Sequence, residues 1–86
     1  MIDLTSTIRT LIIEDNPGDA DLVIERASSE PHRKISFEVQ ESLSAGLQSI
    51  SDSAPDIVLL DPGLPDSIGI PTFEKLHQSF PDVPVI

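Results

Sequence analysis

The stretch that decides the fold is Leu11-Ile12-Ile13-Glu14-Asp15-Asn16-Pro17, in which a short apolar run ends abruptly at two acids. Short runs rich in β-branched residues are typical of strands that are buried on both faces of a parallel sheet. The Asn-Pro pair that follows the acids is typical of a turn. The stretch therefore predicts a strand over 8–13 and places Glu14 and Asp15 just beyond its carboxyl end.

Strand and helix patterns alternate along the rest of the chain. Apolar residues recur with a helical period in three segments, while one alternating segment and two short apolar runs are typical of strands. The expected strands are 8–13, 35–40, 57–60 and 83–86, and the expected helices are 18–28, 44–51 and 71–79. Ser42 or Ser44 can cap the second helix. Such alternation predicts a single α/β domain over 1–86, with parallel strands, helices on both faces and right-handed crossovers.

The composition excludes several classes of function. A net charge of −10, with only 5 basic residues, argues against binding to a nucleic-acid backbone. The chain has no cysteine, which rules out disulfides and thiolate metal sites. Apolar runs of four residues or fewer are far too short to span a membrane, and the first residues lack a signal-peptide pattern. The sequence therefore predicts a cytoplasmic protein with no nucleic-acid or membrane partner.

Three acids stand where a parallel sheet places its functional sites, beyond the carboxyl ends of the strands. Glu14 and Asp15 follow the first strand, and Asp61 follows the third. A lone acid at a strand end is usually just a solvated loop residue, but three carboxylates at one edge repel one another unless a cation lies between them. Oxygen ligands with few protein donors suit Mg²⁺. Asp61 is also the best candidate nucleophile, because a carboxylate can attack phosphorus.

Neither histidine is predicted to be catalytic. His32 falls in an expected loop over 28–33, and His77 falls near the apolar face of the third helix, where packing is the commoner role.

At this point the chain resembles the receiver domains of two-component signalling. The matching stretches are Leu11-Ile12-Ile13-Glu14-Asp15-Asn16-Pro17, Asp56-Ile57-Val58-Leu59-Leu60-Asp61, Leu64-Pro65-Asp66 and Pro81-Asp82-Val83-Pro84-Val85-Ile86. The resemblance implies a flavodoxin-like, doubly wound parallel sheet with strand order 2-1-3-4-5. It also implies a phosphoacceptor module that regulates an output domain or partner protein, rather than an enzyme that turns over a substrate. The phosphodonor would be a histidine kinase or a phosphotransfer domain.

The resemblance assigns roles to individual residues. Asp61 would be the phosphoacceptor and Asp15 would bind Mg²⁺ together with it. Glu14 would act through a metal-bound water, and Gly63 would give its backbone carbonyl to the metal. Pro65 matches a proline that shapes the loop after the acceptor.

The chain departs from the family pattern in two ways. Pro62 stands where the family usually has an aliphatic residue; it removes an N–H beside the acceptor and pushes Asp61 toward extended geometry. The family's fifth strand and last two helices, with their Lys and Ser/Thr, have no counterpart in the 86 residues. The expected strand order is therefore 2-1-3-4, and its exposed fourth strand predicts self-association.

Of two alternatives, the sequence leaves the first open and disfavours the second. A pseudo-receiver would keep the fold as a protein-interaction module that phosphate does not switch, and Pro62 favours it. An aspartate-dependent phosphohydrolase usually has a second Asp two residues after its nucleophile, where this chain has Gly63.

Overall fold

The computed structural model describes residues 7–28 and 34–86. The elements are, in chain order, β1 (Ile8–Ile13), α1 (Pro17–Ser28), β2 (Ile35–Gln40), α2 (Leu43–Asp52), β3 (Ile57–Leu60), β4 (Gly63–Leu64), β5 (Ser67–Ile68) and α3 (Ile70–Ser79). The first three strands occupy the expected spans, and each helix begins one residue earlier than expected. His32 and most of its expected loop lie outside the described residues.

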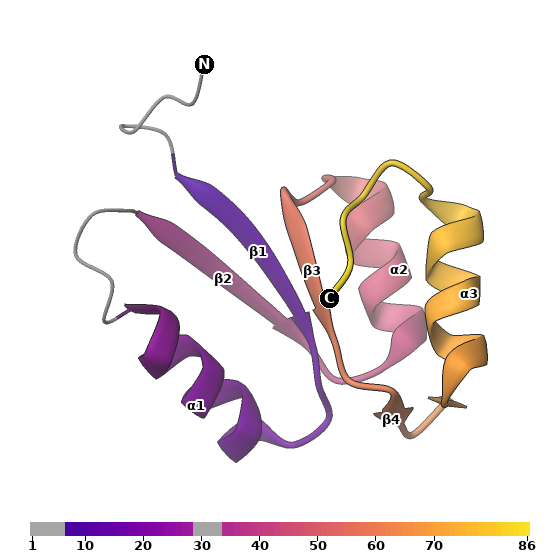
Figure 1. The fold of residues 1–86 in the computed structure, drawn as a ribbon, viewed down its shortest axis with the longest axis horizontal. Coiled ribbons are helices and arrows are strands. Elements are labelled where there is room, and N and C mark those ends of the chain that lie inside the picture. The colour runs from indigo at the N-terminus through magenta and orange to yellow at the C-terminus, as the bar shows by residue number, and fades with distance from the viewer. Residues whose placement is uncertain (1–6, 29–33) are drawn as a thin grey trace.

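The main sheet is parallel, with β1 in the middle and the order β2-β1-β3. The register pairs Ile8 with Ile35 and Thr10 with Ile57. Because the chain moves from β1 to β2 and then crosses back over β1 to β3, right-handed crossovers place α1 on one face and α2 on the other. Figure 1 shows α1 apart from the paired helices α2 and α3. These features confirm the predicted fold class, a doubly wound parallel sheet.

The predicted fourth strand over 83–86 forms only in part. This segment does run parallel to β3, since Val58 N donates to Pro84 O at 2.9 Å and Ile86 N donates to Val58 O at 2.9 Å. The pairing amounts to an isolated bridge between Val58 and Val85. Leu60 N also donates to Ile86 O at 2.9 Å, whereas Pro84 has no N–H with which to extend the pairing toward Val83. The segment nevertheless occupies the expected place in the order, beside β3.

The expected loop after Asp61 contains a small antiparallel hairpin. Its two strands, β4 and β5, pair Gly63 with Ile68 and Leu64 with Ser67. Two-residue strands are too short to show any hydrophobic period, which is why the sequence pattern did not reveal them. Leu64 is buried in the core, so the hairpin is packed onto the domain.

The core lies between the sheet and the helices α2 and α3. Its buried members are Leu11, Ile13, Leu43, Ile50, Val58, Leu64 and Leu76. Gly46 lets α2 approach β1 closely, because a Cβ atom on it would lie 2.4 Å from Ile13 Cδ1. The two layers therefore meet at a contact that only glycine permits.

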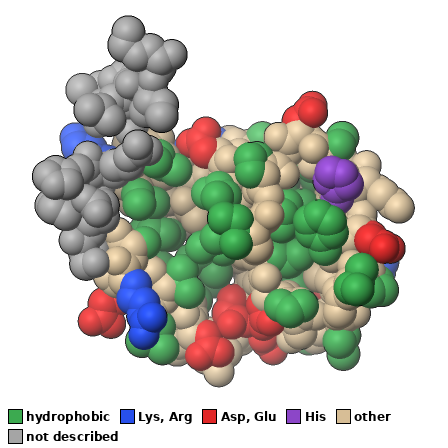
Figure 2. Space-filling view, in the orientation of Figure 1, with side chains coloured by type: hydrophobic (Ala, Val, Ile, Leu, Met, Phe, Trp, Pro, Cys, Tyr) green, Lys and Arg blue, Asp and Glu red, His purple; other side chains and the backbone are tan. Residues whose placement is uncertain are grey.

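The opposite face of the sheet is more open. Ile12, Val23, Leu59 and Ile86 line a pocket of about 320 Å³ that extends to Glu14 and Asp61. Figure 2 shows apolar side chains across the middle of the molecule and acidic side chains gathered at one edge. Within the described ranges, no helix has the length and apolar character needed to cross a membrane.

Candidate metal centre

The backbone brings the ends of β1 and β3 to one edge of the sheet. Glu14 N donates to Gln40 O at 2.9 Å, and Asp61 N donates to Ile13 O at 2.9 Å. These bonds continue the parallel ladders one residue beyond the strands, so the residues that follow β1 and β3 stay side by side. The predicted proximity of the three acids depends on this alignment.

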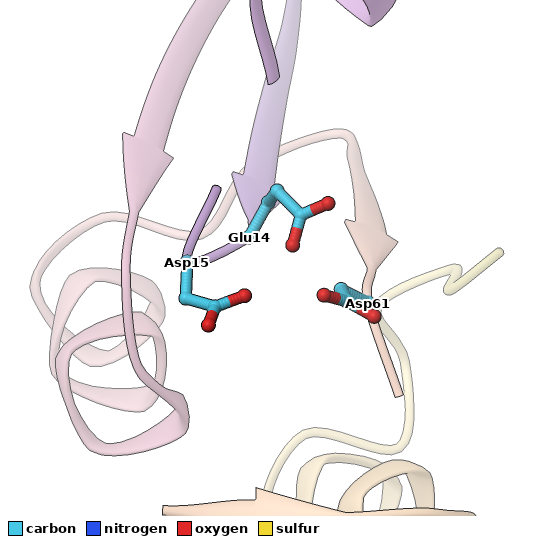
Figure 3. A group of neighbouring side chains, drawn as sticks. All are labelled: Glu14, Asp15 and Asp61. Carbon is cyan, nitrogen blue, oxygen red and sulfur yellow. The ribbon is translucent and has the colours of Figure 1, made fainter. Parts of the chain in front are cut away.

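Glu14, Asp15 and Asp61 meet at this edge. One carboxylate oxygen from each residue lies within 4.8 Å of the other two. Figure 3 shows the side chains facing a common space from the ends of β1 and β3. Glu14 and Asp61 are half-buried, whereas Asp15 is exposed. The sequence therefore predicted correctly that these three acids lie together.

The two half-buried acids of this cluster, Glu14 and Asp61, have pKa values that are shifted in opposite directions. Glu14 Oε2 is buried and has no hydrogen-bond partner among the described residues. A proton on Glu14 can be donated to Asp61, and with burial and repulsion from the Asp61 charge this raises the pKa of Glu14 to about 7. The same shared proton, with a hydrogen bond from the Gly63 N–H, lowers the pKa of Asp61. Glu14 is thus the weaker acid of the pair.

These residues fit a divalent cation. The donors are all carboxylate oxygens, which suit the hard cations Mg²⁺ and Ca²⁺, and only a few of them are offered, which favours the more hydrated Mg²⁺. A buried oxygen without a partner and a raised pKa are both signs that positive charge is lacking between the acids. Asp15 and Asp61 are the candidate direct ligands. The water-mediated role of Glu14 and the carbonyl role of Gly63 stay predictions.

Comparison with known proteins identifies the fold. No family model matches the chain, and no curated protein matches it. Several solved structures, in contrast, match the chain. The non-phosphorylated HemR receiver domain from Leptospira biflexa is 27% identical with a TM-score of 0.70, and the match covers 91% of this chain and 60% of that one.

This chain has the fold of a response-regulator receiver domain. A MaeR response regulator bound to beryllium trifluoride is 23% identical with a TM-score of 0.79, over 92% of this chain and 64% of that one. A LuxR-family two-component response regulator from Aurantimonas sp. SI85-9A1 is 21% identical with a TM-score of 0.74, over 93% and 56%. The chain therefore spans less than two thirds of each of these three structures.

The loop after Asp61 in this receiver fold is tightly held. Gly63 N donates to Asp61 Oδ1 at 2.9 Å. Gly69 N donates to the carbonyl of Pro62 at 2.7 Å, which closes the base of the hairpin. Gly69 has a φ of 80°, a left-handed conformation that favours glycine. Pro65 lies in the hairpin turn, and its loop-shaping role stays a prediction.

One residue of this region was missed by sequence reasoning. Asp66 accepts hydrogen bonds from Leu43 N at 2.8 Å and Ser44 N at 2.9 Å, at the start of α2. Ser42, one of the two predicted caps, accepts from Ala45 N at 3.1 Å. The helix thus has a second cap from a residue more than 20 positions away. No local pattern can indicate such a contact.

Proposed function

We propose that this chain is the phosphoacceptor module of a two-component phosphorelay, in which Asp61 takes a phosphoryl group from a histidine kinase or a phosphotransfer domain. The observation that carries the proposal is the cluster formed by Glu14, Asp15 and Asp61, whose oxygens lie within 4.8 Å of one another. The acceptor is thus beside two further acids in a fold shared with response regulators. In such a signalling role the domain itself is modified by the kinase, and the domain turns over no external substrate.

The transfer needs one bond to form and one to break. A carboxylate oxygen of Asp61 attacks the phosphorus of a phosphohistidine, and the new O–P bond forms as the P–N bond breaks. The electron pair of the broken bond stays on the imidazole nitrogen, which then takes a proton. Little covalent chemistry is left for the protein, so positioning and charge neutralisation dominate.

The residues around Asp61 supply the positioning. The Gly63 N–H holds Asp61 Oδ1, so the carboxylate has a fixed orientation at the end of β3. In our proposal Asp15, Asp61 and the Gly63 carbonyl hold Mg²⁺ directly, and Glu14 holds it through a water. When bound, Mg²⁺ would neutralise the clustered carboxylates and the charge of the incoming phosphoryl group. Beryllium trifluoride is an analogue of the phosphoryl group. Its binding by the similar MaeR response regulator supports the proposal that this fold can accept a phosphoryl group.

The proposal is tested with a small phosphodonor. The protein is incubated with Mg²⁺ and acetyl phosphate, and intact-mass spectrometry should detect one added phosphate that disappears when EDTA removes the metal. Asp61→Asn should abolish the addition, while Asp82→Asn, which changes an exposed acid outside the cluster, should leave it intact. Undiminished labelling of the Asp61→Asn variant would remove Asp61 from this role.

A second candidate is an interaction module that phosphate does not switch. Pro62 favours it, because proline offers no N–H beside the acceptor. Such a module has no need of a metal. A Mg²⁺ titration followed by the Gly63 amide resonance separates the two functions: a saturable shift supports the phosphoacceptor, and an unmoved resonance supports the interaction module.

A further inference from the structure

The hairpin β4–β5 connects the loop that follows Asp61 to the start of α2. Asp66 lies in the turn of the hairpin, and each of its carboxylate oxygens accepts one backbone N–H, from Leu43 and from Ser44. These two N–H donors lower the pKa of Asp66, so the side chain is a carboxylate at neutral pH. The tip of the hairpin is therefore fixed to α2 at both oxygens of one side chain.

The base of the same hairpin reaches the metal centre. Gly63 is the first residue of β4, pairs with Ile68 and donates its N–H to Asp61 Oδ1. Between base and tip, Leu64 is 1% exposed and belongs to the same core cluster as Leu43. A displacement of the tip is thus passed through a short, paired segment to the acceptor carboxylate.

Hydrogen bonds and the short stretches of chain between them form a closed ring around the metal centre. Glu14 N is bonded to the last residue of β2, Gln40, and two residues separate Gln40 from the start of α2. Asp66 then links α2 to the hairpin, and the hairpin leads back to Asp61. The N–H of Asp61 closes the ring at Ile13, the residue before Glu14. Asp66 is the side chain that completes this ring between α2 and the acceptor loop.

We propose that Asp66 is a positioning residue for the metal centre: by holding the hairpin against α2, it keeps Asp61 and Gly63 in place relative to Glu14 and Asp15. The inference rests on the proposed function, because it assumes that the three acids bind Mg²⁺. Asp66 itself touches neither the metal nor the phosphoryl group. Its effect is on the affinity of the centre, through the geometry of the loop.

The test is a titration with Mg²⁺ alone. The chain has no Trp and no Tyr, so binding is followed by the amide resonance of Gly63 or by calorimetry. Changes to residues that orient metal ligands typically weaken affinity about 10–100-fold, and Asp66 acts one step further away, so Asp66→Ala should raise the Kd for Mg²⁺ about five-fold or more. Asp66→Asn should fall between, because its amide oxygen accepts one N–H and its amide nitrogen accepts none.

Two control variants separate positioning from simpler effects. Ser42→Ala removes the other cap of α2 and leaves the hairpin tied, so it reports the effect of helix capping. Glu41→Gln removes an exposed negative charge beside the same pocket as Pro65 and leaves both bonds of Asp66 intact, so it reports the loss of charge. Both should bind Mg²⁺ within about two-fold of the wild type when salt screens charges beyond about 8 Å.

Each result has a distinct meaning. Asp66→Ala with unchanged affinity, or a control variant that weakens binding as much as Asp66→Ala, overturns the inference. A wild-type chain that binds no Mg²⁺ overturns the proposed function, and the inference with it. Should Asp66→Ala fail to fold, Asp66→Asn decides: an affinity for Mg²⁺ below that of the wild type and of both control variants supports positioning, and wild-type affinity contradicts it.

Discussion

Glu14 and Asp61 are neighbours whose pKa values move in opposite directions. The pKa of Glu14 rises from 4.5 to about 7 through its shared proton with Asp61, its burial and the nearby negative charge. That of Asp61 falls below 3.8 because Glu14 and the Gly63 N–H donate to it. At the residue scale, Glu14 therefore loses its proton only as the pH rises through about 7 when no cation is bound.

This pair predicts how stability depends on pH without divalent cations. The folded chain binds a proton on Glu14 more tightly than the unfolded chain does, so the stability from this group is full below pH 4.5 and is lost as pH rises through about 7. The contribution of Asp61 has the opposite sense: it is present above 3.8 and is lost as pH falls through the lowered value. We expect Tm in EDTA to decrease as pH rises from about 5 to about 8.

The matched variant is Glu14→Gln, which cannot lose a proton. Its Tm in EDTA, measured by circular dichroism, should change less over the same pH range than that of the wild type. Equal slopes for the two proteins would mean that Glu14 does not titrate in this window.

Residue-level prediction from sequence had a clear physical limit. The three acids were predictable because the pair Glu14-Asp15 directly follows one apolar strand, Asp61 directly follows another, and parallel strands end at a common edge. Asp66 was not, because its partners Leu43 and Ser44 are distant in sequence and are backbone N–H groups, which carry no residue signature. Contacts from a side chain to distant backbone appear only once the fold is known.

At the scale of elements, the packing of α2 onto β1 depends on Gly46. A Cβ atom there would lie 2.4 Å from Ile13 Cδ1 and 2.9 Å from Ile13 Cγ1. Ile13 is fully buried, so its side chain has little room to move away. Either the helix or the strand must shift to accept a larger residue.

Gly46→Ala should therefore destabilise the protein, even though alanine is the better helix former. Inserting a methyl group into a packed core costs about 1–3 kcal/mol, which exceeds the gain of about 1 kcal/mol in helix propensity. Urea unfolding followed by circular dichroism measures the free energy of unfolding. Ser51→Ala, at an exposed position of the same helix, should change it by less than about 0.5 kcal/mol. A stabilised Gly46→Ala variant would contradict the packing argument.

Gly69 gives a second prediction at this scale. Its φ of 80° and ψ of −156° lie in a region that residues with a Cβ rarely adopt. Gly69→Ala should lower the free energy of unfolding by about 1–3 kcal/mol, and it should also disturb the bond from Gly69 N to Pro62 O at the base of the hairpin. The urea midpoint is compared with that of Gly18→Ala, where φ is ordinary and alanine favours the helix α1, so a loss seen only in Gly69→Ala reflects the backbone conformation of Gly69.

The regular elements were predictable because each contains either a short apolar run or a repeating apolar pattern. β1 and β3 are short apolar runs, and α1, α2 and α3 repeat their apolar residues with the helical period. The hairpin was not predictable, because its two-residue strands carry no period. Segment 83–86 has the composition of a strand and pairs with β3 around the bridge between Val58 and Val85, but Pro84 offers no N–H to extend the pairing toward Val83.

At the scale of the whole molecule, the excess of acid means that a cation held by the proposed centre would stabilise the fold. The formal net charge of −10 counts all three clustered acids as ionised, and repulsion between ionised members of the cluster opposes folding. A ligand that binds only the folded chain stabilises it by mass action, by about 2.7 kcal/mol at a concentration 100 times its Kd. The proposed metal centre should therefore be visible in global unfolding.

Mg²⁺ should raise Tm in a saturable manner at neutral pH. NaCl at matched ionic strength corrects for general screening of charge, and Asp82→Asn corrects for the loss of one negative charge. The Mg²⁺-dependent increase should persist in Asp82→Asn and be largely lost in Asp61→Asn. An equal increase in both variants would show that Mg²⁺ acts through the overall charge and not through the cluster.

The ring of hydrogen bonds through Gln40, Asp66 and Asp61 has a mechanical consequence. Strain introduced at any one member has to be shared by the others, since β1, β2, α2 and the hairpin are joined end to end around the acids. The amides of Leu43, Ser44 and Gly63 should then exchange with deuterium in step and slow down together when the acceptor is modified. If Asp61 is the acceptor, its modification should therefore also be detectable at the start of α2, where Ser44 is exposed.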